Sequence, residues 1–282
     1  MPVSLVGQAG RTNRERGVQK LGQVSQWRAV DCGAVVKTDS GVRIAANVGN
    51  ILGEGPLWHP EAQCLFWFDI LRSKLYRMAG EGDVAVMDLP FMGSAAGWID
   101  AGNLLLAGDD GFYVLDMESG SLHPHMVLED DNPATRSNDG RVDPWGRFWI
   151  GTMGRKLEAA AGALYRLDGA RLEVLKQDIS IPNSIAFSPD RARAYFADSP
   201  SRNILALDLN PETGDILRQR VFASLDDSDS VPDGSVVDSE GYLWNAQWGR
   251  GAWCATRPTA ASTGPLSFPL ASPRARPSAG RI

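Results

Sequence analysis

The chain has 282 residues, of which 43% are hydrophobic and 22% charged, and its formal net charge of −6 at pH 7 argues against nucleic-acid binding, which favours a basic face. Three cysteines, Cys32, Cys64 and Cys254, form no C-x-x-C pair, which argues against a zinc ribbon or a disulfide framework. Because no apolar run approaches the roughly 18 residues that span a bilayer, and no apolar signal segment stands near the first residue, we expect a soluble cytoplasmic protein without a membrane partner.

In chain order, the first predicted unit is a flexible extension over residues 1–20, MPVSLVGQAGRTNRERGVQK, which contains no continuous apolar segment. From residue 21 to residue 249, turn-forming residues alternate with short apolar and aromatic runs, which are CLFWFDI, NLLLAGD, RFWIGTM, ARAYFADS and YLWNAQW. Alternating runs of this length between Gly, Pro and Asp turns are typical of β-strands. We therefore predict an all-β domain over residues 21–249.

The turns of this domain recur at a nearly constant interval. With Pro60, Asp100, Pro144, Pro189 and Ser239 as markers, the spacings are 40, 44, 45 and 50 residues. A repeat of about 40 to 50 residues with three or four strands is the size of one β-propeller blade. The sequence therefore predicts a β-propeller with about five recognisable blades, and a β-sandwich with regularly spaced turns is the alternative.

A polar residue stands six positions before each marker. These residues are Glu54, Ser94, Asn138, Asn183 and Asp233, in the contexts LGEGP, MGSAA, RSNDG, IPNSI and VPDGS. In a propeller, the loops that enter the innermost strands open on one end of the central channel, so residues at the same phase of the repeat converge. We expect these polar side chains to point into a shared axial pocket.

The oxygen atoms of this pocket indicate a hard cation. The carboxylates of Glu54 and Asp233 and the amide carbonyl of Asn183, with Asn138 as a further candidate, form a ligand set without His or Cys. Such a set suits Ca²⁺, Mg²⁺ or Mn²⁺ better than a structural zinc. The alternative is that these Asn and Asp residues only form turns, and Asp139 is interpreted as the residue that holds the Asp-Gly turn.

The same stretches resemble the SMP-30/regucalcin/gluconolactonase family of six-bladed β-propellers. The resemblance rests on LGEGPLW, RSNDGRVDPWGRFWIGTM, GALYRLD, IPNSIAFSPD and VPDGSVVDSEGYLWNAQWG, and it covers about residues 47–249. It implies that Glu54, Asn183 and Asp233 bind a divalent cation. It also implies that Arg136 and Asn138 bind the substrate, which in this family is a sugar-acid lactone.

One position departs from the family pattern. Just after the G-T-M triplet some members place a substrate-contacting Glu, whereas this chain has Gly154, Arg155 and Lys156. We expect this difference to alter the identity of the substrate more than the type of reaction.

The resemblance predicts a metal-dependent hydrolase that opens a sugar-acid lactone. The cation, which is Ca, Mn, Mg or Zn, would polarise the carbonyl group and lower the pKa of a water molecule. Asp233 is the candidate general base, while Arg136, Asn138 and Lys156 would bind and orient the substrate. Two alternatives stay open, namely a non-catalytic calcium- or sugar-binding protein that uses the same pocket and an inactive truncated relative.

The last predicted unit is an Ala/Pro/Arg-rich tail over residues 250–282. No Asp or Glu occurs from Gly241 to Ile282, and no alternating strand pattern follows Trp248. Such a segment cannot bury enough apolar surface to order itself, so we expect it to be irregular. We hypothesise that the tail is a frameshift product that replaces or truncates the last blade.

Overall fold

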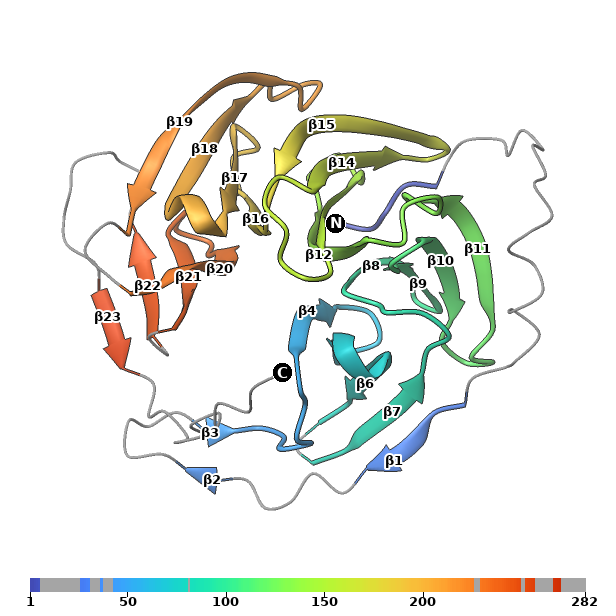
Figure 1. Ribbon diagram of the computed structural model, residues 1–282. Coiled ribbons are helices and arrows are strands. Elements are labelled where there is room, and N and C mark those ends of the chain that lie inside the picture. The colour runs from blue at the N-terminus through green and yellow to red at the C-terminus, as the bar shows by residue number, and fades with distance from the viewer. Residues whose placement is uncertain are drawn as a thin grey trace.

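The computed structural model describes residues 1–5, 26–30, 36–37, 43–80, 82–225, 229–249, 252–256 and 266–269. In these ranges the strands form five sheets of four or five strands and one two-stranded sheet, and the five larger sheets stand around a common axis as the blades of a ring (Figure 1). The predicted all-β propeller with about five blades is therefore confirmed. The helices of the described ranges are two three-residue 3-10 helices, η2 (Ile70–Arg72) and η3 (Ser199–Ser201), and neither is long enough to cross a membrane.

Each blade is an antiparallel meander whose first strand lies nearest the axis (Figure 1). Blade 1 contains β4 (Gly53–His59), β5 (Cys64–Asp69), β6 (Lys74–Met78) and β7 (Val84–Asp88), with β1 (Arg28–Val30) outside β7. Blade 2 contains β8 (Ala95–Asp100), β9 (Asn103–Ala107), β10 (Gly111–Asp116) and β11 (Leu122–Val127). Blade 3 contains β12 (Thr135–Val142), β13 (Phe148–Gly154), β14 (Gly162–Asp168) and β15 (Arg171–Ile179). Blade 4 contains β16 (Pro182–Phe187), β17 (Arg193–Asp198), β18 (Asn203–Leu209) and β19 (Ile216–Ser224).

Blade 5 extends into the segment for which no strand was expected. It contains β20 (Val231–Val237), β21 (Leu243–Trp248), β22 (Ala252–Thr256) and β23 (Leu266–Pro269), and a separate hairpin is formed by β2 (Val36–Lys37) and β3 (Arg43–Ile44). The expectation that no strand follows Trp248 is wrong for β22 and β23, because a strand can pair through its backbone alone, and β22 pairs with the edge of β21. The rest of residues 250–282 lies outside the described residues, so the irregular tail and its frameshift origin stay predictions.

The first five residues pack against the propeller, although they belong to the extension expected to be flexible. The backbone N–H of Val3 donates to the carbonyl of Trp98 in β8, and that of Ser4 donates to the carbonyl of Gly146, both at 2.8 Å. Val3 is buried in the same apolar cluster as Val142 and Phe148. This segment therefore links blade 2 to the β12–β13 turn of blade 3, while residues 6–20 lie outside the described residues.

Aspartates hold the turns between the two inner strands of blades 3 and 5. In each turn the Oδ1 atom of Asp143 or Asp238 accepts hydrogen bonds from the backbone N–H groups two and four residues later, at 2.9 to 3.0 Å. The Oδ2 atom accepts from the indole N–H six residues later, which belongs to Trp149 at 3.0 Å and to Trp244 at 2.7 Å. These two turns are therefore fixed by Asx hydrogen bonds, and their aspartates also anchor a tryptophan of the second strand.

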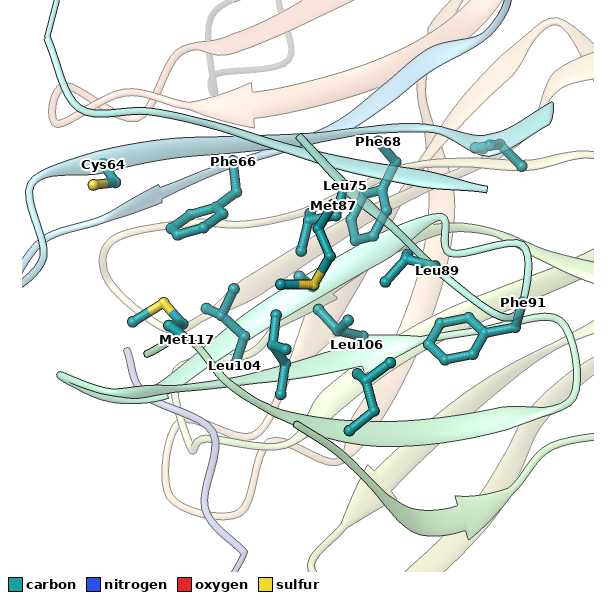
Figure 2. Packing of buried hydrophobic residues seen from close by; sticks show 14 residues of the cluster. Cys64, Phe66, Phe68, Leu75, Met87, Leu89, Phe91, Leu104, Leu106 and Met117 are labelled. Atoms are coloured by element: carbon teal, nitrogen blue, oxygen red, sulfur yellow. The ribbon is translucent and has the colours of Figure 1, made fainter. Parts of the chain in front are cut away.

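The core lies in layers between neighbouring blades. Figure 2 shows the layer between blades 1 and 2, where Phe66, Phe68 and Met87 face Leu104 and Leu106. Similar clusters lie between blades 2 and 3, 3 and 4, and 4 and 5. Because burial of each large apolar side chain stabilises by about 1.5–3 kcal/mol, these layers hold the inner strands at fixed positions around the axis.

Candidate active site

Backbone bulges interrupt four of the five inner strands at the positions where polar residues were predicted to converge. The pairing register with the second strand shifts between Glu54 and Leu57, Ser137 and Gly140, Asn183 and Ala186, and Pro232 and Ser235. A bulge leaves residues outside the ladder and turns their side chains away from the usual alternation. Asn138, Asp139 and Asp233 lie outside the ladder and are therefore aimed by local backbone geometry as well as by the repeat. Glu54 and Asn183 are the last paired residues before their bulges.

The backbone turns sharply directly after two of these residues. Gly55 follows Glu54 with φ of 60°, and Ser184 follows Asn183 with φ of 61°. A Cβ atom on Gly55 would lie 2.2 Å from the carbonyl oxygen of Ser94 in the neighbouring blade. Glycine is therefore required after Glu54, because the backbone of β4 passes so close to blade 2.

An open cavity of about 470 Å³ lies on the axis of the ring. Its polar lining includes Glu54, Asp139 and Asp233, which come from β4, β12 and β20, and its apolar lining includes Trp58 and Trp98. Carboxylates that are far apart in the sequence therefore meet at one cavity. This is the convergence that the phase of the repeat predicted for Glu54 and Asp233.

The three carboxyl groups have raised pKa values. Burial, followed by the charges of Asp233 and Asp139, raises the pKa of Glu54 to about 8. Burial raises the pKa of Asp139 to about 6, against the opposing charge of Arg141, and burial also raises the pKa of Asp233. Since buried carboxylates that face one another disfavour ionisation, this arrangement favours a proton or a cation among them.

Asn183 lies beside Asp233, and its amide oxygen faces acceptors. Its Oδ1 atom is 3.3 Å from Asp233 Oδ1 and 3.3 Å from the carbonyl oxygen of Pro182, while Asn138 Nδ2 lies at 3.5 Å, at the outer limit of a hydrogen bond. Its Nδ2 atom donates to Ser199 Oγ at 2.8 Å. Two acceptor oxygens directed at each other are satisfied when a cation binds both.

Arg136 and Asn138 are joined at the same end of β12. One Arg136 guanidinium nitrogen, Nη1, donates to the Ser137 carbonyl oxygen at 2.8 Å and to Asn138 Oδ1 at 2.9 Å. The Asn138 amide in turn donates to the Pro182 carbonyl oxygen at 2.9 Å. Burial lowers the pKa of Arg136, and the charge of Glu54 opposes that effect, so Arg136 lies within electrostatic reach of the Glu54 carboxylate.

Lys156 lies apart from the other predicted residues. Arg136, Asn138 and Asn183 also lie outside the lining of the axial cavity, but they contact one another, and Asn183 lies beside Asp233. Lys156 lies in the exposed turn after β13, where its backbone N–H donates to Glu158 Oε2 at 2.9 Å, and it is not among the residues that line the axial cavity. The neighbouring Arg155 is paired with Asp109 at 2.6 Å and donates to the carbonyl oxygen of Pro133 at 3.0 Å. The structure thus does not bring Lys156 together with Glu54 and Asp233.

Sequence reasoning missed the part that Asp139 plays. Its carboxyl group bonds the backbone of Gly140, as expected for the Asp-Gly turn, but its Oδ2 atom also accepts from the backbone N–H of Ile185 in β16 at 2.8 Å. It therefore joins blade 3 to blade 4 and faces the axial cavity. The bulge at this point places the side chains of consecutive residues in the site, which an alternating pattern cannot reveal.

Arg141 also joins inner strands. From β12, its Nε atom donates to the carbonyl oxygen of Ile185 in β16 at 3.0 Å, and its Nη2 atom donates to that of Ser235 in β20 at 3.1 Å. Its charge also opposes the rise in the pKa of Asp139. Arg141 therefore holds three inner strands together beside the carboxylates.

Two further aspartates have a recognisable sequence signal. Asp69 and Asp198 stand 15 residues after Glu54 and Asn183. The Asp69 carboxylate accepts from the backbone N–H groups of residues 51 and 52, and that of Asp198 from those of residues 180 and 181. Each aspartate thus fixes the loop that enters the inner strand of its own blade.

The donor chemistry of the site fits a hard divalent cation. Among the described residues, no group of three or more His, Cys, Asp or Glu side chains is arranged to hold a metal ion. A cation shared by Glu54 and Asp233 therefore needs a third ligand of another kind, and the acceptor-facing amide oxygen of Asn183 has the right chemistry and position.

Comparisons with known proteins give a consistent result. The sequence pattern described as "SMP-30/Gluconolactonase/LRE-like region" matches residues 52–276, which extends beyond the limit of residue 249 expected from the sequence. The chain is 39% identical over 234 residues to "Putative sugar lactone lactonase" of Rhizobium meliloti, covering 82% of this chain and 79% of the relative. It is 39% identical over 212 residues to "6-deoxy-6-sulfogluconolactonase" of Pseudomonas putida, covering 72% and 70%.

One solved structure is similar to this chain over most of the length of both proteins. It is described as a calcium-binding protein, regucalcin, from Agrobacterium tumefaciens, and it shares 41% identity with a TM-score of 0.74. The match covers 77% of this chain and 74% of that chain. The similarity therefore extends over most of the ring of blades.

Proposed function

Because the chain belongs to the SMP-30/gluconolactonase/LRE-like family, we propose that it is a metal-dependent lactonase that opens a sugar-acid lactone. The observation that carries the proposal is the meeting of the Glu54 and Asp233 carboxylates at one axial cavity beside the amide oxygen of Asn183. The names of the two sugar-lactone relatives support the class of reaction and substrate.

Glu54, Asn183 and Asp233 would hold one divalent cation. The all-oxygen donor set favours Ca²⁺, Mg²⁺ or Mn²⁺, and Zn²⁺ is the remaining candidate. The description of a regucalcin relative as a calcium-binding protein supports a divalent cation of this kind. When bound, such an ion supplies polarisation of the lactone carbonyl.

Asp233 is proposed as the general base. Its side chain is half-buried and lines the cavity, so a water molecule can reach it. Its backbone carbonyl accepts from Ser184 Oγ at 2.6 Å and from Asn245 Nδ2 at 3.1 Å, which fixes the position of the residue. In the reaction the water oxygen attacks the carbonyl carbon while its proton passes to Asp233, and the ring C–O bond then breaks as the proton moves to the leaving oxygen.

Arg136 and Asn138 are proposed to bind the sugar. Arg136 has donors beyond the two N–H groups of Nη1 that serve Ser137 and Asn138, because a guanidinium carries five N–H groups. These donors suit the hydroxyl groups of a sugar and the negative charge that develops on the carbonyl oxygen. Lys156 remains a proposed substrate-binding residue. Because it lies in the exposed turn after β13, it would contact the substrate from outside the axial cavity.

A panel of aldonolactones tests the proposal. We expect hydrolysis that chelation abolishes and that added Ca²⁺ or Mn²⁺ restores, and we expect Asp233→Ala to lower kcat/KM by about 10²- to 10⁴-fold. Glu240→Ala is the matched control, because Glu240 is exposed in the β20–β21 turn of the same blade. Hydrolysis at an unchanged rate in the Asp233 variant would refute the assignment.

A non-catalytic calcium- or sugar-binding protein is the alternative, and the names of the lactonase relatives favour the enzyme over it. It would use the same ligands for a cation or a sugar without turnover. Calorimetric binding of Ca²⁺ in a chain that hydrolyses no lactone of the panel would favour this candidate. A chain that neither binds nor hydrolyses would correspond to an inactive relative.

A further inference from the structure

Ser199 is a buried hydroxyl that the proposed reaction does not use. It is the first residue of η3 and is 2% exposed. Its Oγ atom has two close polar neighbours, the carbonyl oxygen of Pro232 at 2.6 Å and Asn183 Nδ2 at 2.8 Å. One of these neighbours is the residue before Asp233 and the other is the candidate amide ligand.

The single hydroxyl hydrogen of Ser199 determines how Ser199 can bond with Pro232 and Asn183. A serine hydroxyl has one hydrogen, and the Pro232 carbonyl oxygen can only accept. When Ser199 donates to Pro232, its oxygen is left as an acceptor for Asn183. The group of Asn183 that faces Ser199 must then be the NH₂ group, which directs Oδ1 towards Asp233.

The opposite orientation of the amide would suit a site without a cation. A turned amide would donate to Asp233 Oδ1 and to the Pro182 carbonyl oxygen, both at 3.3 Å. It would also place an oxygen against Ser199, whose single hydrogen cannot serve both that oxygen and Pro232. The Pro182 carbonyl oxygen, moreover, already accepts from Asn138 at 2.9 Å, so it gains little from the turned amide.

We propose that Ser199 is a positioning residue that fixes the Asn183 amide with its oxygen towards the cation shared with Asp233. The proposal deepens the proposed function and rests on the proposed cation site. The hydroxyl is held in place by its own backbone, because the Ser199 N–H donates to the Ile181 carbonyl at 2.9 Å and its carbonyl accepts from Arg202 N–H at 3.0 Å. Ser199 thus ties the loop before β16 to the strand that carries Asp233.

Calorimetric titration of chelator-treated protein with Ca²⁺, and separately with Mn²⁺, tests the inference. We expect Ser199→Ala to weaken cation binding by about 10- to 100-fold, as is usual when a residue that orients a ligand is lost. Ser201→Ala is the control, because Ser201 is exposed in the same 3-10 helix and its hydroxyl accepts from Asn203 N–H at 3.2 Å, away from Asn183. The affinity of the Ser201→Ala chain for the cation should change by less than about 3-fold by the same reasoning.

A second substitution separates orientation from general support. In Asn183→Asp both terminal atoms are oxygens, so rotation no longer matters. We therefore expect Ser199→Ala to change the cation affinity of the Asn183→Asp chain by less than about 3-fold. An equal loss in the wild-type and Asn183→Asp backgrounds, or no loss in the wild-type background, would overturn the inference while leaving the cation site intact.

The two proposals fail in different ways. A wild-type chain that binds neither ion would remove the proposed cation site and this inference with it. If Ser199→Ala does not fold, as judged by circular dichroism, Ser199→Cys takes its place in the same cycle, because a thiol of similar size is a weak acceptor. The expected loss is then smaller and is again confined to the background that keeps Asn183, and a loss of equal size in both backgrounds contradicts the inference.

Discussion

At the scale of single residues, the site depends on what each polar atom already bonds. Arg136 is buried, and its Nη1 atom is shared between the Ser137 carbonyl and the Asn138 amide. The guanidinium is therefore held in one orientation, with other N–H groups left for a ligand. A lysine ammonium at this position would keep the charge but lose the planar fork.

We expect Arg136→Lys to lower kcat/KM for the best lactone of the panel by about 10- to 100-fold, because a hydrogen bond to a charged group contributes roughly 1.5–3 kcal/mol. Steady-state kinetics measures the change. Arg218→Lys is the control, since Arg218 lies on the outer strand β19 with its side chain 71% exposed and pairs with Asp208. Equal rates for the two variants would argue against substrate binding by Arg136.

At the scale of elements, the approach of one inner strand to the next determines where Glu54 lies. β4 passes so close to blade 2 that the missing side chain of Gly55 makes room for the carbonyl oxygen of Ser94. The same glycine has a positive φ that other residues adopt at a cost. Contact between blades and the direction of the Glu54 side chain are thus coupled through one position.

We expect Gly55→Ala to destabilise the protein by about 2 to 5 kcal/mol, the sum of overpacking and a left-handed alanine. Urea unfolding followed by tryptophan fluorescence measures the loss. Gly102→Ala is the matched control, because a Cβ there would meet nothing closer than Asp100 Oδ1 at 3.7 Å. Similar stabilities for both variants would contradict the role given to the close contact.

The sequence allowed prediction of the elements and of part of the site. Strands, turns and the phase of Glu54, Asn183 and Asp233 follow from local patterns that repeat, so the fold class and the meeting of Glu54 and Asp233 could be foreseen. The inward position of Asp139 and the bonding of Ser199 could not, because they depend on bulges and on neighbours from another blade. The strands of blade 5 beyond Trp248 escaped prediction for a related reason, since backbone pairing needs no pattern of its own.

At the scale of the whole molecule, the proposed cation would connect blades that are distant in the sequence. Glu54 belongs to blade 1, Asn183 to blade 4 and Asp233 to blade 5. A ligand that binds only the folded arrangement of these three blades stabilises the folded state. The stability of the ring should therefore depend on the cation as well as on the apolar layers between blades.

We expect the melting temperature to rise by roughly 5 to 10 °C when a chelated sample receives Ca²⁺ at about 100 times its Kd, which corresponds to about 2.7 kcal/mol. Thermal unfolding by circular dichroism measures the shift. Asp233→Ala should melt at the same temperature with and without Ca²⁺. A wild-type melting temperature that is the same with and without Ca²⁺ would contradict a cation held between blades.

The bulges in the inner strands have a further consequence for how this fold can evolve. Residues inside a bulge contribute no rung to the ladder, and the rungs on either side carry the blade without them. Gly55 lies inside such a bulge, but its contact with Ser94 does not allow exchange. Exchanging Asn138, Asp139 or Asp233, which also lie inside bulges, alters the chemistry at the axis while the apolar layers keep their shape. A scaffold built in this way can acquire a new substrate through a few exchanges at these positions, without having to be refolded around each one.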